Sequence, residues 1–151
     1  MVPSLHSLFF GSKLPRWPFV ALSAFTLFSF TFAAYAVGVF RVTGGVVFIP
    51  YDAAVVAVLA AFGIGYVRRG LLVSWIFAYA CLLGFHTDHG FLGLSHRSLP
   101  SRFGSFLQLD GLGYLAIEAV ILGTLAFFVG LAISAVIGFV RRERGPAPNS
   151  H

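Results

Sequence analysis

The sequence predicts an all-α integral membrane protein, and three observations support this prediction. The chain has 151 residues, of which 58% are hydrophobic and only 10% charged, whereas soluble domains carry about 25% charged residues. Long apolar stretches follow one another along the chain, and arginine-bearing breaks separate them. These stretches predict a four-transmembrane-helix bundle in the cell membrane, and they cover residues 18–40, 46–67, 70–85 and 113–140.

The first apolar stretch, Phe19 to Phe40, contains no charged residue. As a helix it is about 33 Å long, which is enough to cross the hydrocarbon core. Within it, Ala34-Tyr35-Ala36 follows an apolar run, a pattern typical of a signal-peptidase site. Because the apolar run continues to Phe40, we favour an uncleaved membrane helix. A removed signal peptide is the alternative.

The second and third stretches predict a tight helical hairpin. Pro50-Tyr51-Asp52 indicates a helix start with Asp52 as its N-cap, so the regular second helix would cover only Ala53 to Val67. Arg68-Arg69-Gly70 follows at once and leads into the third helix, Leu71 to Phe85. Because both helices are short, a re-entrant hairpin is the alternative. It would place two arginines in lipid at a cost of several kcal/mol.

The loop 86–112 precedes the last stretch and contains a short amphipathic segment. Its apolar residues share one helical face after Pro100, and they predict a short interfacial helix in this last outer loop. They are Leu99, Phe103, Phe106 and Leu107. The last stretch, 113–140, is about 40 Å long as a helix, so it must tilt or extend beyond the hydrocarbon. Arg141-Arg142-Glu143-Arg144 is expected to end it, and residues 141–151 to form a disordered tail.

The basic residues predict the orientation of the bundle. With four crossings, seven lie on one side and three on the other, which places both termini, including residues 1–17, in the cytoplasm. The seven are Lys13, Arg16, Arg68, Arg69, Arg141, Arg142 and Arg144, and the three are Arg41, Arg97 and Arg102. The membrane therefore explains where the basic residues behind the net charge of +5 lie. We therefore expect the lipid bilayer as partner, and no nucleic acid.

Glu118 is the only carboxylate inside a predicted membrane helix. Burial of an ionisable group in lipid is costly, so Glu118 is a candidate for proton or cation handling. It lies about five residues into its helix, roughly 8 Å from the start, where the positive helix end favours a carboxylate. A structural role is therefore the simpler interpretation. Asp110, just before this helix, is a second ion or proton candidate, and its simpler role is that of a cap or a solvated loop residue.

Three histidines and a carboxylate gather in the predicted outer loop, and they are metal candidates. They are His86, Asp88, His89 and His96. Imidazole and carboxylate groups suit zinc, copper or nickel. A proton or pH sensor is an alternative role for the same cluster, because histidine titrates at about pH 6.5. The spacing matches none of the stronger metal motifs, so we favour a polar loop without metal and expect no cofactor. With Asp110 and Glu118 these residues could meet at the outer mouth of the bundle.

Small residues recur every three or four positions along the last stretch. Such a stripe marks a face along which membrane helices approach closely. The stripe consists of Ala119, Gly123, Ala126, Gly130, Ser134 and Gly138. The spacing does not tell whether this face packs within its own bundle or against another subunit.

The absence of catalytic motifs shapes the functional hypotheses. The sequence has no glycine-rich phosphate loop and no serine nucleophile elbow, and Cys81 is its single cysteine. An enzyme is therefore less favoured. The leading hypothesis is a non-enzymatic packing, assembly or accessory component that pairs with itself or a membrane partner through the last helix. The alternative is a transporter or an ion- and proton-handling protein that uses Glu118 and the outer histidine loop.

Overall fold

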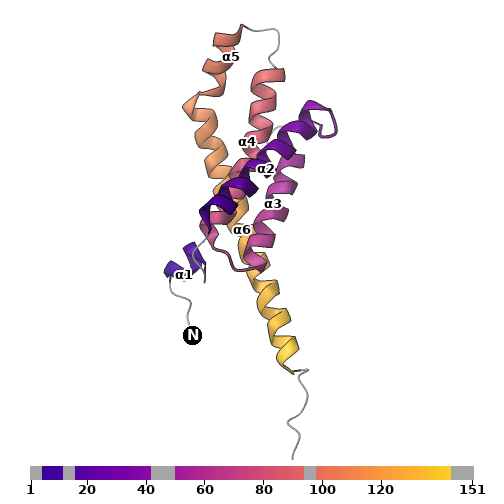
Figure 1. Ribbon diagram of the computed structural model, residues 1–151, viewed down its shortest axis with the longest axis vertical. Coiled ribbons are helices and arrows are strands. Elements are labelled where there is room, and N and C mark those ends of the chain that lie inside the picture. The colour runs from indigo at the N-terminus through magenta and orange to yellow at the C-terminus, as the bar shows by residue number, and fades with distance from the viewer. Residues whose placement is uncertain (1–4, 12–15, 42–49, 94–97, 144–151) are drawn as a thin grey trace, which may run out of the picture.

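The computed structural model describes residues 5–11, 16–41, 50–93 and 98–143, and over these residues helices are its only regular secondary structure. Its elements are α1 (Leu5–Phe10), α2 (Trp17–Ala36), α3 (Tyr51–Tyr66), α4 (Leu71–Asp88), a π-helical turn (His89–Gly93), α5 (Leu99–Phe106) and α6 (Leu109–Glu143). In Figure 1, α2 and α4 run upward and α3 and α6 run downward, while α5 lies at the top near the end of α4. The lower part of α6 extends past the other helices.

Membrane-crossing length is reached by three helices among the described residues. These helices, Trp17–Ala36, Leu71–Leu92 and Leu109–Arg142, are long and apolar enough to cross a membrane. The fourth apolar helix, α3, has 16 residues, which is about 24 Å and shorter than a hydrocarbon core of about 30 Å. The prediction of an all-α membrane protein is therefore confirmed, and a fourth crossing stays a prediction.

The start of α3 differs from the prediction. The N-cap of α3 is Pro50, and Asp52 lies in the first turn instead of capping the helix. The Asp52 carboxylate accepts a hydrogen bond of 2.9 Å from the backbone N–H of Arg41. Asp52 therefore joins the start of α3 to the chain that leaves α2. The predicted stretch 46–67 begins among residues that the structure does not describe.

The helices α4 and α6 are longer than their apolar stretches. Helix α4 continues through His86 to Asp88 and passes into the π-helical turn, and α6 begins at Leu109 and ends at Glu143. The basic residues near position 141 were expected to end the last helix, but they form its last turn. Helical hydrogen bonding does not stop where the hydrocarbon ends, and cations are favoured at a helix C-terminus.

Helix α4 lies at the centre of the bundle and contacts α2, α3 and α6. Helix α6 also packs along α3. The core lies where these helices meet, and alanines fill much of it. Its buried members are Tyr35, Ala53, Ala57, Ala78, Cys81, Leu82, Leu115 and Ala119. Small side chains allow the close helix packing by which membrane bundles are held.

Two contacts hold α2 against its neighbours. The buried Thr31 of α2 lies directly against Gly84 of α4, where a Cβ would collide with the threonine hydroxyl. The Tyr35 hydroxyl, near the end of α2, accepts a hydrogen bond of 3.2 Å from the backbone N–H of Ala53 in the first turn of α3. The last two turns of α2 are thus part of the folded bundle.

Candidate functional site

The side chain of Glu118 is buried in the bundle. It is 8% exposed, and neither of its carboxyl oxygens has a hydrogen-bond partner among the described residues. Its neighbours in sequence, Leu115 and Ala119, belong to the core. Helix α6, which carries Glu118, packs against both α3 and α4. A buried polar group without a partner is rare in folded proteins, so Glu118 is the first candidate for a binding role.

His86 lies on the same side of the bundle, two helical turns away along α6. Its ring atom Cε1 would be 3.3 Å from a Cβ placed on Gly111, so the imidazole packs on the backbone of α6. Glu118 follows Gly111 by seven residues, which is two turns and about 10 Å along one helix face. The described structure therefore aligns an imidazole at the end of the bundle with a carboxyl group in its interior.

Asp110 lies in the first turn of α6, where its side chain is exposed. A carboxylate is favoured at this positive end of a helix. The sequence placed Asp110 just before the helix, whereas α6 already begins at Leu109 and includes it. Asp110 and Glu118 are thus at different depths, one at the surface and one in the core.

The two histidines near the end of α4 face different elements. The His86 ring lies 5.4 Å from the Phe106 ring of α5, and its Nε2 is 3.4 Å from the Phe106 carbonyl oxygen. The exposed His89 ring stacks on Phe85 at 6.0 Å, and Phe85 in turn contacts Tyr35 of α2. The two imidazoles therefore contact different parts of the bundle.

No group of three histidine, cysteine, aspartate or glutamate side chains that could hold a metal ion occurs among the described residues. His86, the half-buried Asp88 and His89 are therefore not gathered into a metal centre by themselves. The fourth metal candidate, His96, lies outside the described residues.

The small-residue stripe of α6 is divided between the bundle and its surroundings. The upper four positions, Ala119, Gly123, Ala126 and Gly130, are buried, whereas Ser134 is half-buried and Gly138 exposed. A Cβ on Gly123 would lie 3.0 Å from the Trp75 ring of α4. A Cβ on Gly130 would collide with the backbone of Phe62 and Tyr66 in α3. The upper stripe is thus filled by the chain's own helices.

A second small-residue stripe, which the sequence analysis missed, lies on α3. It consists of Ala53, Ala57, Ala61 and Gly65, all of them buried. A Cβ on Gly65 would collide with the backbone of Phe127 in α6. The spacing of four residues was visible in the sequence and is the same small-xxx-small pattern that marked α6. The two stripes explain how α3 and α6 come so close.

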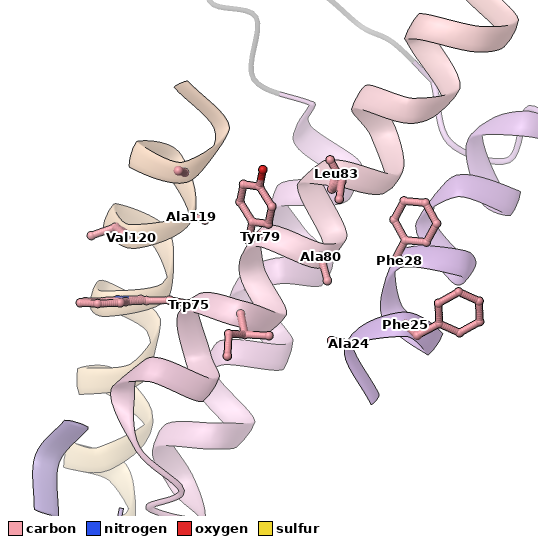
Figure 2. Close-up of a pocket in the computed structure, with 11 residues that line it drawn as sticks. Ala24, Phe25, Phe28, Trp75, Tyr79, Ala80, Leu83, Ala119 and Val120 are labelled. Atoms are coloured by element: carbon pink, nitrogen blue, oxygen red, sulfur yellow. The ribbon is translucent and has the colours of Figure 1, made fainter. Parts of the chain in front are cut away.

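An apolar groove of about 460 Å³ lies between α2, α4 and α6. Figure 2 shows Trp75 and Tyr79 on the side of α4 near α6, and Phe25 and Phe28 on α2 across the groove. Trp75 is held in place because its Nε1 donates a hydrogen bond of 2.9 Å to the Thr124 hydroxyl. Sequence reasoning had no means to find this groove, because it is formed by three helices that are distant in the chain.

Comparison with protein-family models, with curated proteins and with solved structures gives no match.

Proposed function

We propose that this chain is a multi-pass membrane protein that takes up a proton or a cation at Glu118. The observation behind the proposal is the buried carboxyl group without a hydrogen-bond partner among the described residues. A carboxylate in such surroundings costs several kcal/mol unless a charge or a donor compensates it. A bound proton or cation removes that cost, and ionisable residues in membrane helices commonly serve ion or proton pathways.

The path to Glu118 begins at the end of the bundle that holds His86. The imidazole is half-buried between α5 and α6, and an imidazole can hold a proton on either ring nitrogen. A proton or cation would move from this end to Glu118, about 10 Å deeper along one face of α6.

The proposal places four helices across the cell membrane with both termini on the cytoplasmic side. Helix α3 packs along α6, and a short helix can cross when the bilayer thins locally around it. The exposed Arg68 and Arg69 at the turn between α3 and α4 favour the cytoplasmic surface for that turn. At the other end, Leu99 and Phe103 of α5 are exposed, as expected for a helix that lies on the membrane surface.

A flux assay tests the function. The purified protein is reconstituted into vesicles that contain a pH-sensitive dye, and proton entry is followed after an imposed pH gradient. Tracer sodium and potassium are followed in parallel. We expect Glu118→Gln to abolish the flux, because the amide cannot release a proton or balance a cation. The control Asp110→Asn changes an exposed carboxylate on the same helix and should retain the flux.

Two outcomes contradict the proposal. One is a flux through the parent protein no faster than through empty vesicles, and the other is a Glu118→Gln flux equal to that of the parent. Thermal unfolding of Glu118→Gln in detergent separates loss of flux from loss of fold. We expect the variant to be at least as stable as the parent, because it no longer buries an ionisable group.

Self-assembly through the lower part of α6 is the second candidate. Val136 and Phe139 are each 62% exposed, in the part of α6 that extends past the other helices (Figure 1). A Cβ on Gly138 would have no neighbour within 4 Å, so this end of the stripe is free for a second copy or a membrane partner.

Oligomeric state tests the second candidate. We expect Gly138→Leu to convert a dimer into a monomer, as measured by light scattering in detergent and by cross-linking in membranes. The control Ala132→Leu places the same leucine side chain at an exposed position about 120° away around the helix. A monomeric parent, or a dimer that survives Gly138→Leu, would remove this candidate.

A further inference from the structure

The directions of the helices that line the apolar groove between α2, α4 and α6 distinguish its two ends. Helices α2 and α4 run in the same direction (Figure 1), and they are close both at Thr31 and Gly84 and along the groove. Helix α6 runs in the opposite direction. Both α2 and α4 therefore begin at the same end of the groove, below Ala24 and Trp75.

Three arginines lie at that end. Arg16 directly precedes α2, and Arg68 and Arg69 lie in the turn before α4. All three are exposed, and no described residue forms a salt bridge with them. The positive ends of the two helix dipoles point the same way and add to the field of the guanidinium groups. The arginines thus make the protein surface beyond this end of the groove attractive to anions.

The dimensions fit one leaflet of a bilayer. From Arg69 to Leu83, the farthest groove residue on α4, the helix rises about 21 Å. One leaflet with its headgroups is about 20–22 Å thick. A headgroup at the arginines would therefore direct its acyl chain along Trp75, Tyr79 and Leu83.

We propose that this groove binds one acyl chain of an anionic phospholipid, whose phosphate lies against Arg16, Arg68 and Arg69. The groove side chains are apolar or aromatic, and the indole N–H of Trp75 is already bonded to Thr124, so the groove offers packing surface to a hydrocarbon chain. The selectivity for a negative headgroup comes from the arginines, because a zwitterionic headgroup gains less from them.

Trp75 supplies a direct probe of occupancy. The chain has two tryptophans, Trp17 and Trp75, and Trp17→Phe leaves Trp75 as the only indole. The variant is reconstituted into vesicles that contain a small fraction of lipid brominated in the middle of its acyl chains. Bromine quenches an indole on contact. The brominated lipid is phosphatidylglycerol in one set of vesicles and phosphatidylcholine in the other, at equal mole fraction.

We expect stronger quenching of Trp75 by brominated phosphatidylglycerol than by brominated phosphatidylcholine. When Arg68→Gln and Arg69→Gln are added to the Trp17→Phe variant, the preference for phosphatidylglycerol should fall about fivefold for each arginine removed. The preference should also fall as salt is raised, because exposed charges are screened. The matched control carries Arg141→Gln and Arg142→Gln, two arginines of the last turn of α6, and should keep the preference.

A second variant tests the groove apart from the arginines. Ala116 lines the groove from an exposed position on α6, so Ala116→Phe fills the space without a change in the core. We expect it to reduce quenching by both brominated lipids while the helix content and thermal stability stay those of the parent.

The proposal fails if the two lipids quench Trp75 equally. It also fails if the Arg141→Gln/Arg142→Gln control loses as much preference as the Arg68→Gln/Arg69→Gln variant, because the preference would then be a general attraction of anionic lipid to a basic protein. Unchanged quenching in Ala116→Phe would show that the acyl chain does not lie in the groove.

Discussion

The Ser74 hydroxyl on α4 donates a hydrogen bond of 2.9 Å to the backbone carbonyl oxygen of Gly123 on α6. The bond is possible because glycine leaves no side chain between the two helices. The next residue on each helix repeats the connection, since Trp75 Nε1 donates to the Thr124 hydroxyl over 2.9 Å. Two adjacent polar contacts thus set the register between α4 and α6 in surroundings that are otherwise apolar.

Replacement of Ser74 by alanine should weaken the bundle by about 0.5–1.5 kcal/mol, as is typical for one hydrogen bond between membrane helices. Ser74 is fully buried, so water cannot substitute for the lost donor. Thermal unfolding in detergent, followed by circular dichroism, measures the change. The control is Ser23→Ala, at an exposed position on α2, and should unfold with the parent. Equal stability of Ser74→Ala and Ser23→Ala would contradict the prediction.

Replacement of glycine by alanine in the α6 stripe should lower the free energy of unfolding at Gly130 but not at Gly138. A Cβ on Gly130 would meet the backbone of Phe62 and Tyr66, which cannot move aside as a flexible side chain can, so Gly130→Ala should cost about 1–3 kcal/mol. Gly138 has open space around it, and Gly138→Ala should be neutral or stabilising by up to about 1 kcal/mol through helix propensity. Unfolding in detergent compares the two. Similar losses in both variants would disprove the division of the stripe.

Tyr35→Phe should destabilise the junction of α2 and α3. The Tyr35 side chain is 6% exposed, and its hydroxyl is the acceptor for the Ala53 N–H. Without the hydroxyl that buried N–H has no acceptor, which costs about 1–3 kcal/mol. Hydrogen exchange at Ala53 and thermal unfolding both report the change. The control Tyr51→Phe removes a hydroxyl from an exposed side chain and should leave the exchange of Ala53 as it is in the parent.

Gly70→Ala should release α1 from α4. Gly70 has a φ of +103°, and a Cβ there would lie 2.6 Å from the Phe9 carbonyl oxygen at the end of α1. Gly38, with a φ of +74°, has nothing within 4 Å of the same Cβ position. Gly38→Ala therefore meets only the backbone strain of a positive φ, about 1 kcal/mol.

The fluorescence of Trp75 distinguishes the two glycine variants, because the Phe9 ring packs on Trp75 at 5.9 Å. We expect a shift of the Trp75 emission in Gly70→Ala and none in Gly38→Ala, measured with Trp17 replaced by phenylalanine. The close approach of α1 to the α3–α4 turn would be refuted if both variants kept the emission of the parent.

The observed helix ends show that the apolar pattern predicts the membrane stretches better than it predicts where the helices begin and end. The pattern marked the third stretch as 70–85 and the last as 113–140, yet α4 continues to Asp88 and α6 covers Leu109–Glu143. Hydropathy reports which residues suit hydrocarbon, whereas a helix ends where its hydrogen bonding ends. Asp52 was predicted as an N-cap from its residue type, but its carboxylate instead bonds the backbone of Arg41, a partner that only the folded chain brings near.

The sequence by itself determined the class of this protein, because apolar runs of membrane length leave the backbone no alternative to helices in lipid. It also marked Glu118 as a candidate for proton or cation handling and the small-residue stripe on α6 as a helix-packing face. Tertiary structure decided what surrounds them. Only the packing of α3 and α4 on α6 leaves the Glu118 carboxyl without a described partner and fills the upper stripe. Small residues permit several close pairings between helices, and the choice among them depends on contacts between residues far apart in the chain.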